Sequence, residues 1–347
     1  MKKIFLITCS IIISAFWVSN VYAGGKTEKV PEGKIAVAAT FDAMQELTKV
    51  VGKDKVHVYT IIPPGVEAHD FEPKAGDLTF LTQAKAVVYN GFDMEPWLDD
   101  ALHAVKREDI RTICATTGIT PIEVAEGHHH HHHHHHHGDA HGHDDDHDMH
   151  EHDSDDCDED CCCGHDHGDN DAHDHHEHAV DPHAWLSLES AKIMVKNIAA
   201  GLSEVDPANA AFYQANAAAF TADADKILVP YKENFAKLSH RRFVTGHAAF
   251  GYLCRDFNIE QNSVEDVFSE GEPSAKQLAK LIDYCNQYGI KTVFTETAAS
   301  PQVSQTLAKE VGASVETIYT IESAEDGMSY MERMRSNIEK IYKSLAK

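Results

Sequence analysis

Residues 24–347 lack any apolar run of the roughly 20 residues that a helix needs to cross a bilayer. They also lack a basic stripe, since the chain has 30 Lys and Arg against 56 Asp and Glu and a formal net charge of −26. We therefore expect neither a membrane span nor a nucleic-acid partner. Neither the HExxH motif of zinc proteases nor the nucleophile elbow of serine hydrolases occurs, so an enzyme is not expected.

The first 23 residues have the layout of a signal peptide. A lysine pair precedes an apolar run from Ile4 to about Val18, and small residues follow up to Ala23. This pattern predicts export to the periplasm, with cleavage near Ala23. Cleavage at Cys9, as in a lipoprotein, is the alternative, but it would leave an apolar segment of only a few residues.

Cysteine is scarce in the part of the chain that is expected to fold. Outside the signal peptide and residues 128–178 there are Cys114, Cys254 and Cys285. An oxidising compartment is compatible with a Cys254–Cys285 disulfide, although the sequence does not determine it.

Residues 128–178 hold 21 of the 27 histidines and 17 acidic residues, with no lysine or arginine. Ten histidines run unbroken from His128 to His137. Imidazole and carboxylate together bind divalent metals, and a segment with so few apolar residues cannot bury a core. We interpret it as a metal-collecting insertion without a fold of its own; a solvating acidic linker is the alternative. Cys157 and Cys161–Cys163 do not match the spacing of a structural zinc site, and their role stays open.

The remaining sequence alternates short β-rich runs with amphipathic helical stretches, and this pattern is repeated in the second half. The predicted strands are Lys34–Ala39, Val56–Ile62, Ala86–Tyr89, Arg242–Thr245, Thr292–Thr295 and Ser314–Ile318. The predicted helices are Phe41–Val51, Ala75–Ala84, Glu95–Val105, Ala248–Phe257, Ser274–Tyr288, Pro301–Val311 and Ser329–Leu345. The fold class is therefore α/β, with two lobes built on parallel sheets.

An alanine-rich stretch at 206–238 predicts one long helix between the lobes, with Asp206 as its N-cap and Pro207 at its first position. Pro230 is expected to kink the helix or end it early. The expected domains are a signal peptide (1–23), an N-terminal lobe (24–205) that contains the insertion, and a C-terminal lobe (239–347).

Four metal-ligating side chains follow predicted strands or the insertion, where ligands of α/β sheets are expected. His69 follows the strand that ends at Ile62, and His247 follows the strand that ends at Thr245. His183 stands where the insertion rejoins the folded chain, and Glu322 follows the strand Ser314–Ile318. A single such histidine is more often a surface or core residue, but together they indicate a metal site.

The carboxylate of this site is less determined than its histidines. Glu322 ranks first, Glu296 second and Glu67 third, because each lies near a strand end or near His69. His57, His103 and His240 are interpreted as structural or solvent-facing.

The chain resembles the metal-binding solute-binding proteins of ABC transporters, the ZnuA/TroA/AdcA type. The resemblance rests on blocks in the same order along nearly the whole mature chain: PPGVEAHDFEPK, DPHAWLSLESAKIMVKNIA, RFVTGHAAFGYL, FTETAAS and SYMERMRSNIEKI. It implies two α/β lobes joined by a long rigid helix, with the metal bound between them. It also implies a monomer that delivers its ion to an inner-membrane permease with a cytoplasmic ATPase.

The resemblance places His69, His183 and His247 on the family's ligand positions. Members that look manganese-selective usually carry a carboxylate where His247 stands, so a third imidazole implies Zn²⁺, in agreement with ligand preference. The fourth position is an Asp, a Glu or water in the family, and Glu322 matches it by its place before the SYMERM block. The Asn-Pro-Leu or Asp-Pro-Leu motif that is common near this position in zinc members is absent, and Tyr319-Thr320-Ile321 stands there instead.

The sequence thus predicts a zinc-binding component of a transporter whose histidine-rich segment collects zinc for the site or buffers it. The alternatives are a manganese, nickel or copper binder or a periplasmic metal buffer, and the least favoured is a zinc hydrolase.

Overall fold

A computed structural model describes residues 30–69, 71–124, 180–267, 274–296, 302–324 and 326–346. The predicted signal peptide, the histidine-rich insertion with its four cysteines, and Pro301 lie outside the described residues. Among those that are described, no helix has both the length and the apolar content to cross a membrane.

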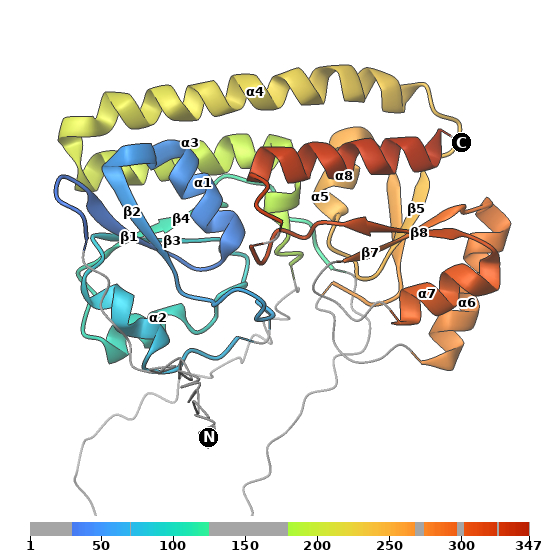
Figure 1. The fold of residues 1–347 in the computed structure, drawn as a ribbon, viewed down its shortest axis with the longest axis horizontal. Coiled ribbons are helices and arrows are strands. Elements are labelled where there is room, and N and C mark those ends of the chain that lie inside the picture. The colour runs from blue at the N-terminus through green and yellow to red at the C-terminus, as the bar shows by residue number, and fades with distance from the viewer. Residues whose placement is uncertain are drawn as a thin grey trace, which may run out of the picture. The chain divides into compact units, whose positions relative to one another are not determined.

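Two four-stranded sheets, each wholly parallel, form the framework of the described chain (Figure 1). The strands of the N-terminal sheet are β1 (Ile35–Ala39), β2 (Val56–Thr60), β3 (Ala86–Tyr89) and β4 (Arg111–Cys114), in the order β2-β1-β3-β4. The strands of the C-terminal sheet are β5 (Arg242–Thr245), β6 (Glu260–Ser263), β7 (Thr292–Glu296) and β8 (Ser314–Ile318), in the order β6-β5-β7-β8. The two sheets thus share one topology, and the predicted α/β class is confirmed.

Helices flank both sheets, and α1, α6, α7 and α8 each begin one residue after the start that the sequence predicts. The α-helices are α1 (Asp42–Gly52), α2 (Leu98–Ala104), α3 (Leu188–Val205), α4 (Ala210–Ala236), α5 (Gly251–Phe257), α6 (Ala275–Tyr288), α7 (Gln302–Val311) and α8 (Tyr330–Leu345). Short 3-10 turns are η1 (Lys53–Lys55), η2 (Asp77–Thr82), η3 (Ala184–Leu186) and η4 (Pro207–Asn209). Ser274 and Ser329 each form a capping box, which explains why α6 and α8 start directly after these serines.

Three details differ from the prediction. Strands β4 and β6 were not predicted, and the expected helix Ala75–Ala84 is the shorter 3-10 turn η2. Cys254 and Cys285 are both free thiols, so the considered disulfide between them is wrong. Cys254 packs against the larger of the two apolar clusters and Cys285 lies inside the smaller one, which keeps the two sulfurs in separate parts of the core.

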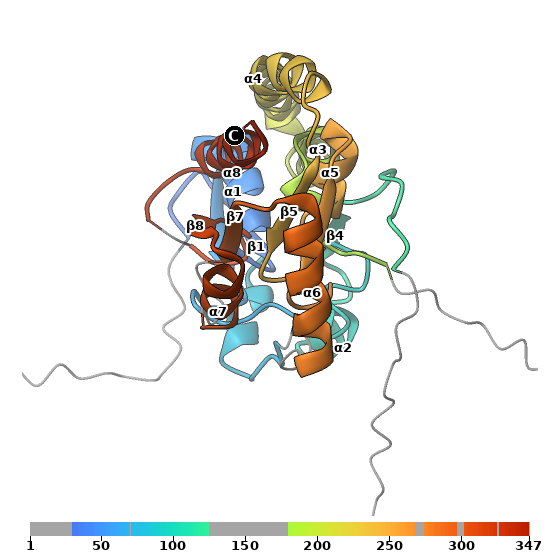
Figure 2. The same cartoon turned by 90° about the vertical axis from the view of Figure 1, so that its right-hand side faces the viewer.

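Helix α4 is the long helix that connects the two halves, and it runs along both of them (Figures 1 and 2). It begins at Ala210 with Asn209 as its N-cap, so the prediction of Asp206 as N-cap and Pro207 as first helical residue is wrong; these two residues are instead the N-cap and the first residue of η4. Of the two outcomes expected at Pro230, a kink or an early end, the early end does not occur, because the helix continues to Ala236. Asp206 precedes η4, and its carboxylate accepts hydrogen bonds from Asn209 and Tyr213. One stripe of α4 is buried: Tyr213, Asn216, Ala217, Phe220, Ala224, Ile227, Leu228 and Phe235. Because this stripe contacts α1 and α3 in one half and α5 and α8 in the other, α4 fixes both halves to a single element.

The two halves also share one continuous apolar cluster, which includes residues of α1, α3, α4, α5 and α8. Within it lies a buried ion pair in which Arg333 Nη1 of α8 donates to Asp42 Oδ2 of α1 at 2.6 Å. Both residues are at most 5% exposed. This pair therefore locks the last helix of the chain onto the first.

Replacing Arg333 by Met is expected to lower the free energy of unfolding by about 3–5 kcal/mol, because Asp42 then remains buried without its cation. The exposed Arg335 on the same helix offers the matched control, and Arg335→Met should change stability by less than about 0.5 kcal/mol. Urea unfolding followed by circular dichroism measures both variants. Equal stability of the two variants would contradict the role of the pair.

Candidate metal centre

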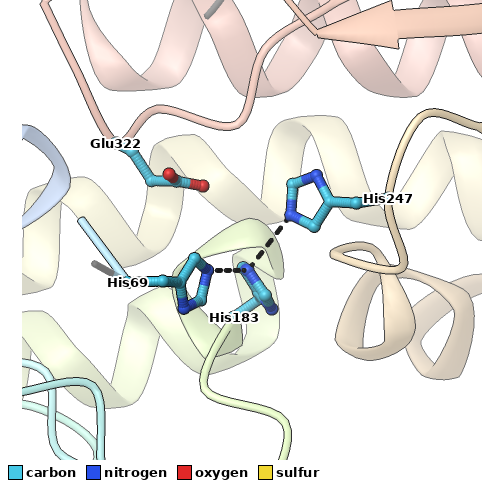
Figure 3. Close-up of side chains that lie close together, drawn as sticks. All are labelled: His69, His183, His247 and Glu322. Carbon is cyan, nitrogen blue, oxygen red and sulfur yellow. Dashed lines mark hydrogen bonds between the residues drawn. The ribbon is translucent and has the colours of Figure 1, made fainter. Parts of the chain in front are cut away.

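Four side chains from four separate segments converge between the two sheets (Figure 3). They are His69, His183, His247 and Glu322, and one ligating atom from each lies within 4.8 Å of all the others. No other group of three or more such side chains is found among the described residues. The fold therefore brings together the four residues that the sequence analysis names as the leading candidate ligands.

The spacing of the imidazole nitrogens fits a tetrahedral metal. Nε2 of His183 lies 3.0 Å from Nε2 of His69 and 3.3 Å from Nε2 of His247. Zinc–nitrogen bonds of 2.0–2.1 Å in a tetrahedron place neighbouring nitrogens about 3.3 Å apart. Glu322 has one carboxylate oxygen, Oε1, buried without a hydrogen-bond partner. A cation on the three nitrogens is a natural partner for that oxygen.

His69 comes from the loop that follows β2. It is half-buried, whereas His183, His247 and Glu322 are at most 6% exposed. Residue Ala68 before it is buried and anchors the loop in the core. His69 is therefore the ligand nearest to solvent.

His183 lies just before η3 and is fully buried. Two contacts fix its segment: Asn90 Nδ2 donates to Pro182 O, and Trp185 Nε1 donates to Thr320 O at 2.7 Å. Ser187 then caps α3 by accepting from Ser190 N. The segment that carries His183 is thus held at both ends.

His247 stands two residues after the end of β5. Its carbonyl oxygen accepts from Thr245 Oγ1 at 2.6 Å and from Gln261 Nε2 at 2.8 Å. These bonds tie the turn to its own strand and to the neighbouring β6. The imidazole is therefore presented by a rigid strand end rather than by a free loop.

Glu322 follows β8, and the segment Thr320–Ser323 is fastened to the N-terminal half. Besides the bond from Trp185, Glu322 O accepts from Asp42 N at 3.3 Å, and Ser323 Oγ accepts from Gly65 N at 2.6 Å. Ile321 is fully buried with φ of 59°, a left-handed conformation that is rare for a β-branched residue. The docking contacts hold this strained residue in place and turn Glu322 towards the histidines.

Burial and neighbouring charges shift the pKa values of His183, His247 and Glu322 in different directions. Burial, reinforced by His69 and His247, holds the pKa of His183 well below its usual value. Burial alone would also lower the pKa of His247, but the carboxylates of Glu296, Glu322 and Glu67 outweigh it and raise that pKa to about 9. Burial, together with Glu67, raises the pKa of Glu322 to about 8.

Glu296 and Glu67, the second and third candidates for the carboxylate ligand, lie outside the group of four. Glu296 approaches His247 from the Nδ1 side, at 3.6 Å, and so lies behind this ligand rather than among the four. Glu67 is exposed and interacts with Glu322. His57 is half-buried on β2, while His103 and His240 are exposed, as the sequence predicts.

A further carboxylate, which the sequence did not indicate, contacts His183. Asp181 Oδ1 accepts from Nδ1 of His183 at 2.8 Å and is almost fully buried. Its only signal was its place two residues before a ligand in DPHAW.

Comparisons with known proteins place this chain and its fold among the metal-binding solute-binding proteins. The family model "Zinc-uptake complex component A periplasmic" matches residues 37–344, and the chain belongs to this family. The resemblance to metal-binding solute-binding proteins that the sequence shows is therefore confirmed. Members of this family are solute-binding transport proteins located outside the cytoplasm, which also confirms the expectation that the chain is not an enzyme.

Two curated relatives match over most of their length. A putative metal-binding protein of Treponema pallidum is 40% identical, over 90% of this chain and 88% of the relative. The high-affinity zinc uptake system protein ZnuA of Bacillus subtilis is 33% identical with the same coverage. A crystal structure of a ZnuA deletion mutant with zinc bound superposes with a TM-score of 0.67, at 26% identity over 90% of this chain and 98% of that one.

The pKa shifts predict that metal affinity rises with pH. The raised pKa values of His247 and Glu322 mean that this pair retains protons at pH 7, and a dication must displace them to bind. Affinity should increase by up to about tenfold per pH unit for each proton released, up to about pH 9, and level off above it. Zinc calorimetry in buffers of different ionisation enthalpy counts these protons. An affinity that is constant between pH 6 and pH 8 would contradict the shifts.

Proposed function

We propose that this protein binds one Zn²⁺ between its two sheets through His69, His183, His247 and Glu322, and delivers it to the permease of an ABC transporter. The observation that carries the proposal is the convergence of three imidazole nitrogens and one carboxylate oxygen within 4.8 Å. Three imidazoles favour zinc over manganese, which prefers carboxylate and water. The zinc-uptake family and the zinc-uptake role of the Bacillus subtilis relative support the same ion.

The arrangement also fits a carrier. Three of the four proposed ligands are buried, so water has little access to the ion. Four protein ligands fill a tetrahedral site, whereas a catalytic zinc keeps one position open for water or substrate. Three neutral imidazoles and one carboxylate leave a net charge of about +1 on the bound zinc. Since His69 alone is half-buried, the ion is expected to enter and leave on its side.

We further propose that the protein is exported to the periplasm, is cleaved near Ala23, and acts as a monomer. Its partner would be an inner-membrane permease with a cytoplasmic ATPase. The signal-peptide layout of residues 1–23 and the family description support these finer statements.

Replacing His69 or His247 by Ala should weaken zinc binding by more than about 100-fold, since loss of a ligand exceeds the ~10–100-fold effect of losing one of its outer partners. His103→Ala and His240→Ala serve as controls, because both histidines are exposed and one lies in each half of the chain. Zinc titration against a competing chelator, with stoichiometry read by native mass spectrometry, measures the effect. Near-native affinity in both ligand variants would sink the assignment.

The histidine-rich insertion is proposed to collect zinc for this site. Residue 178 is only five positions before His183 in the sequence, and many weak ligands tethered to one strong site raise the effective concentration of the ion there. Deleting residues 128–178 should leave one tightly bound zinc but lower the total stoichiometry and slow uptake at limiting zinc. A variant with a Gly/Ser segment of equal length is the control for chain length. Unchanged stoichiometry after deletion would refute the collecting role.

A further inference from the structure

Two buried carboxylates lie behind the four ligands, on the side of the histidines that faces away from the metal position. Asp181 is 2% exposed and Glu296 is 4% exposed. They come from opposite halves of the chain, since Asp181 precedes His183 in the first half and Glu296 ends β7 in the second. Neither belongs to the converging group of ligand atoms.

Asp181 holds His183 through one oxygen. Its Oδ1 accepts from the backbone N–H of His183 at 2.9 Å and from Nδ1 of the same residue at 2.8 Å. Nδ1 is thereby the donor nitrogen, and Nε2 is left as the lone-pair nitrogen that points to His69 and His247. The two bonds fix both the tautomer and the orientation of the ring.

Glu296 repeats this arrangement at His247. Its Oε1 accepts from the backbone N–H of His247 at 3.2 Å and lies 3.6 Å from Nδ1. The second contact is longer than a hydrogen bond, and a small rotation of the ring on metal binding would shorten it. In both cases one carboxylate oxygen faces the backbone N–H and the Nδ1 of the same histidine.

The other oxygen of each carboxylate lies against a glycine of the segment that carries His247. A Cβ added to Gly246 would stand 2.0 Å from Oε2 of Glu296, and one added to Gly251 would stand 2.7 Å from Oδ2 of Asp181. Both glycines have ordinary negative-φ backbones, so neither is required by its conformation. A side chain at either position would instead have to displace the carboxylate oxygen.

We propose that Asp181 and Glu296 are positioning residues of the zinc site, each holding the Nδ1 side of a ligand histidine so that Nε2 faces the ion. This inference rests on the proposed zinc function. An anionic acceptor on Nδ1–H makes an imidazole a stronger metal ligand and limits its rotation. It also offsets the charge of about +1 that the four ligands leave on the zinc, in a region where that charge is poorly screened.

The test uses the full mature protein with Asp181→Asn and Glu296→Gln, which keep the size of the side chain and its acceptor oxygen but remove the negative charge. Each should weaken zinc affinity by about 10–100-fold while the cleft still binds one ion. Asp256→Asn is the matched control: Asp256 also accepts from a side chain, Ser187, and a backbone N–H, Glu189, but contacts no ligand. Its affinity should stay within about twofold of wild type.

A second measurement, made on the wild type and on the three variants, separates positioning from general stability. Long-range ¹H–¹⁵N NMR of the zinc-bound wild-type protein should show His183 and His247 protonated at Nδ1 and bound through Nε2. In the Asn and Gln variants, the Nδ1–H signal of the affected histidine should shift or broaden through exchange, whereas in Asp256→Asn it should not change.

The outcomes distinguish this inference from the function on which it rests. If wild type binds one zinc and His183→Ala does not, but Asp181→Asn and Glu296→Gln bind as tightly as wild type, the positioning role is overturned and the zinc site stands. Zinc bound through Nδ1 would overturn it as well. If wild type binds no zinc in the cleft, the proposed function itself fails.

Discussion

The docking of the segment Thr320–Ser323 against the N-terminal half is the contact on which the site depends. The Trp185 indole, the Asp42 amide and the Gly65 amide each donate to this short segment of the C-terminal half. Trp185 lies two residues after His183, and Gly65 lies four residues before His69. Asp42 is the first residue of α1, which contacts α4. Without this docking, nothing else in the segment would hold Glu322 beside the three histidines. Helix α4 and the Asp42–Arg333 pair act in the same direction by holding the halves together.

These contacts hold the four candidate ligands close together, so the site is largely preformed. A preformed site does not spend binding free energy on ordering its ligands, so more of the zinc–ligand interaction appears as affinity. The cost is local, in the left-handed backbone of Ile321 and in the raised pKa values of His247 and Glu322. Strain and shifted pKa values gather where the ion binds, while the strands and capped helices around the site follow their ordinary preferences.

The sequence predicted the α/β class, most helices and strands, and the four converging residues, because these leave strong local signals. Valine-rich parallel strands read as continuous apolar runs, and ligands were sought where such strands end. The missed strand β6 reads Glu-Gln-Asn-Ser and carries no apolar signal, since it lies at a sheet edge. The stretch expected as a helix at 75–84 is a 3-10 turn in which Thr79 and Thr82 hydroxyls bond to carbonyls three residues back. The roles of Asp181 and Glu296 depend on which side of a ring they face, which only coordinates reveal.

The carboxylate behind His247 restricts how the metal preference of such a protein can change over evolution. Replacing this histidine by an acidic residue would set a second carboxylate beside the buried Glu296, with the buried Glu322 nearby. Like charges at that distance oppose one another strongly when water is excluded. A single substitution of His247 by Asp or Glu would therefore have to bury two like charges or keep one of the two carboxyl groups protonated.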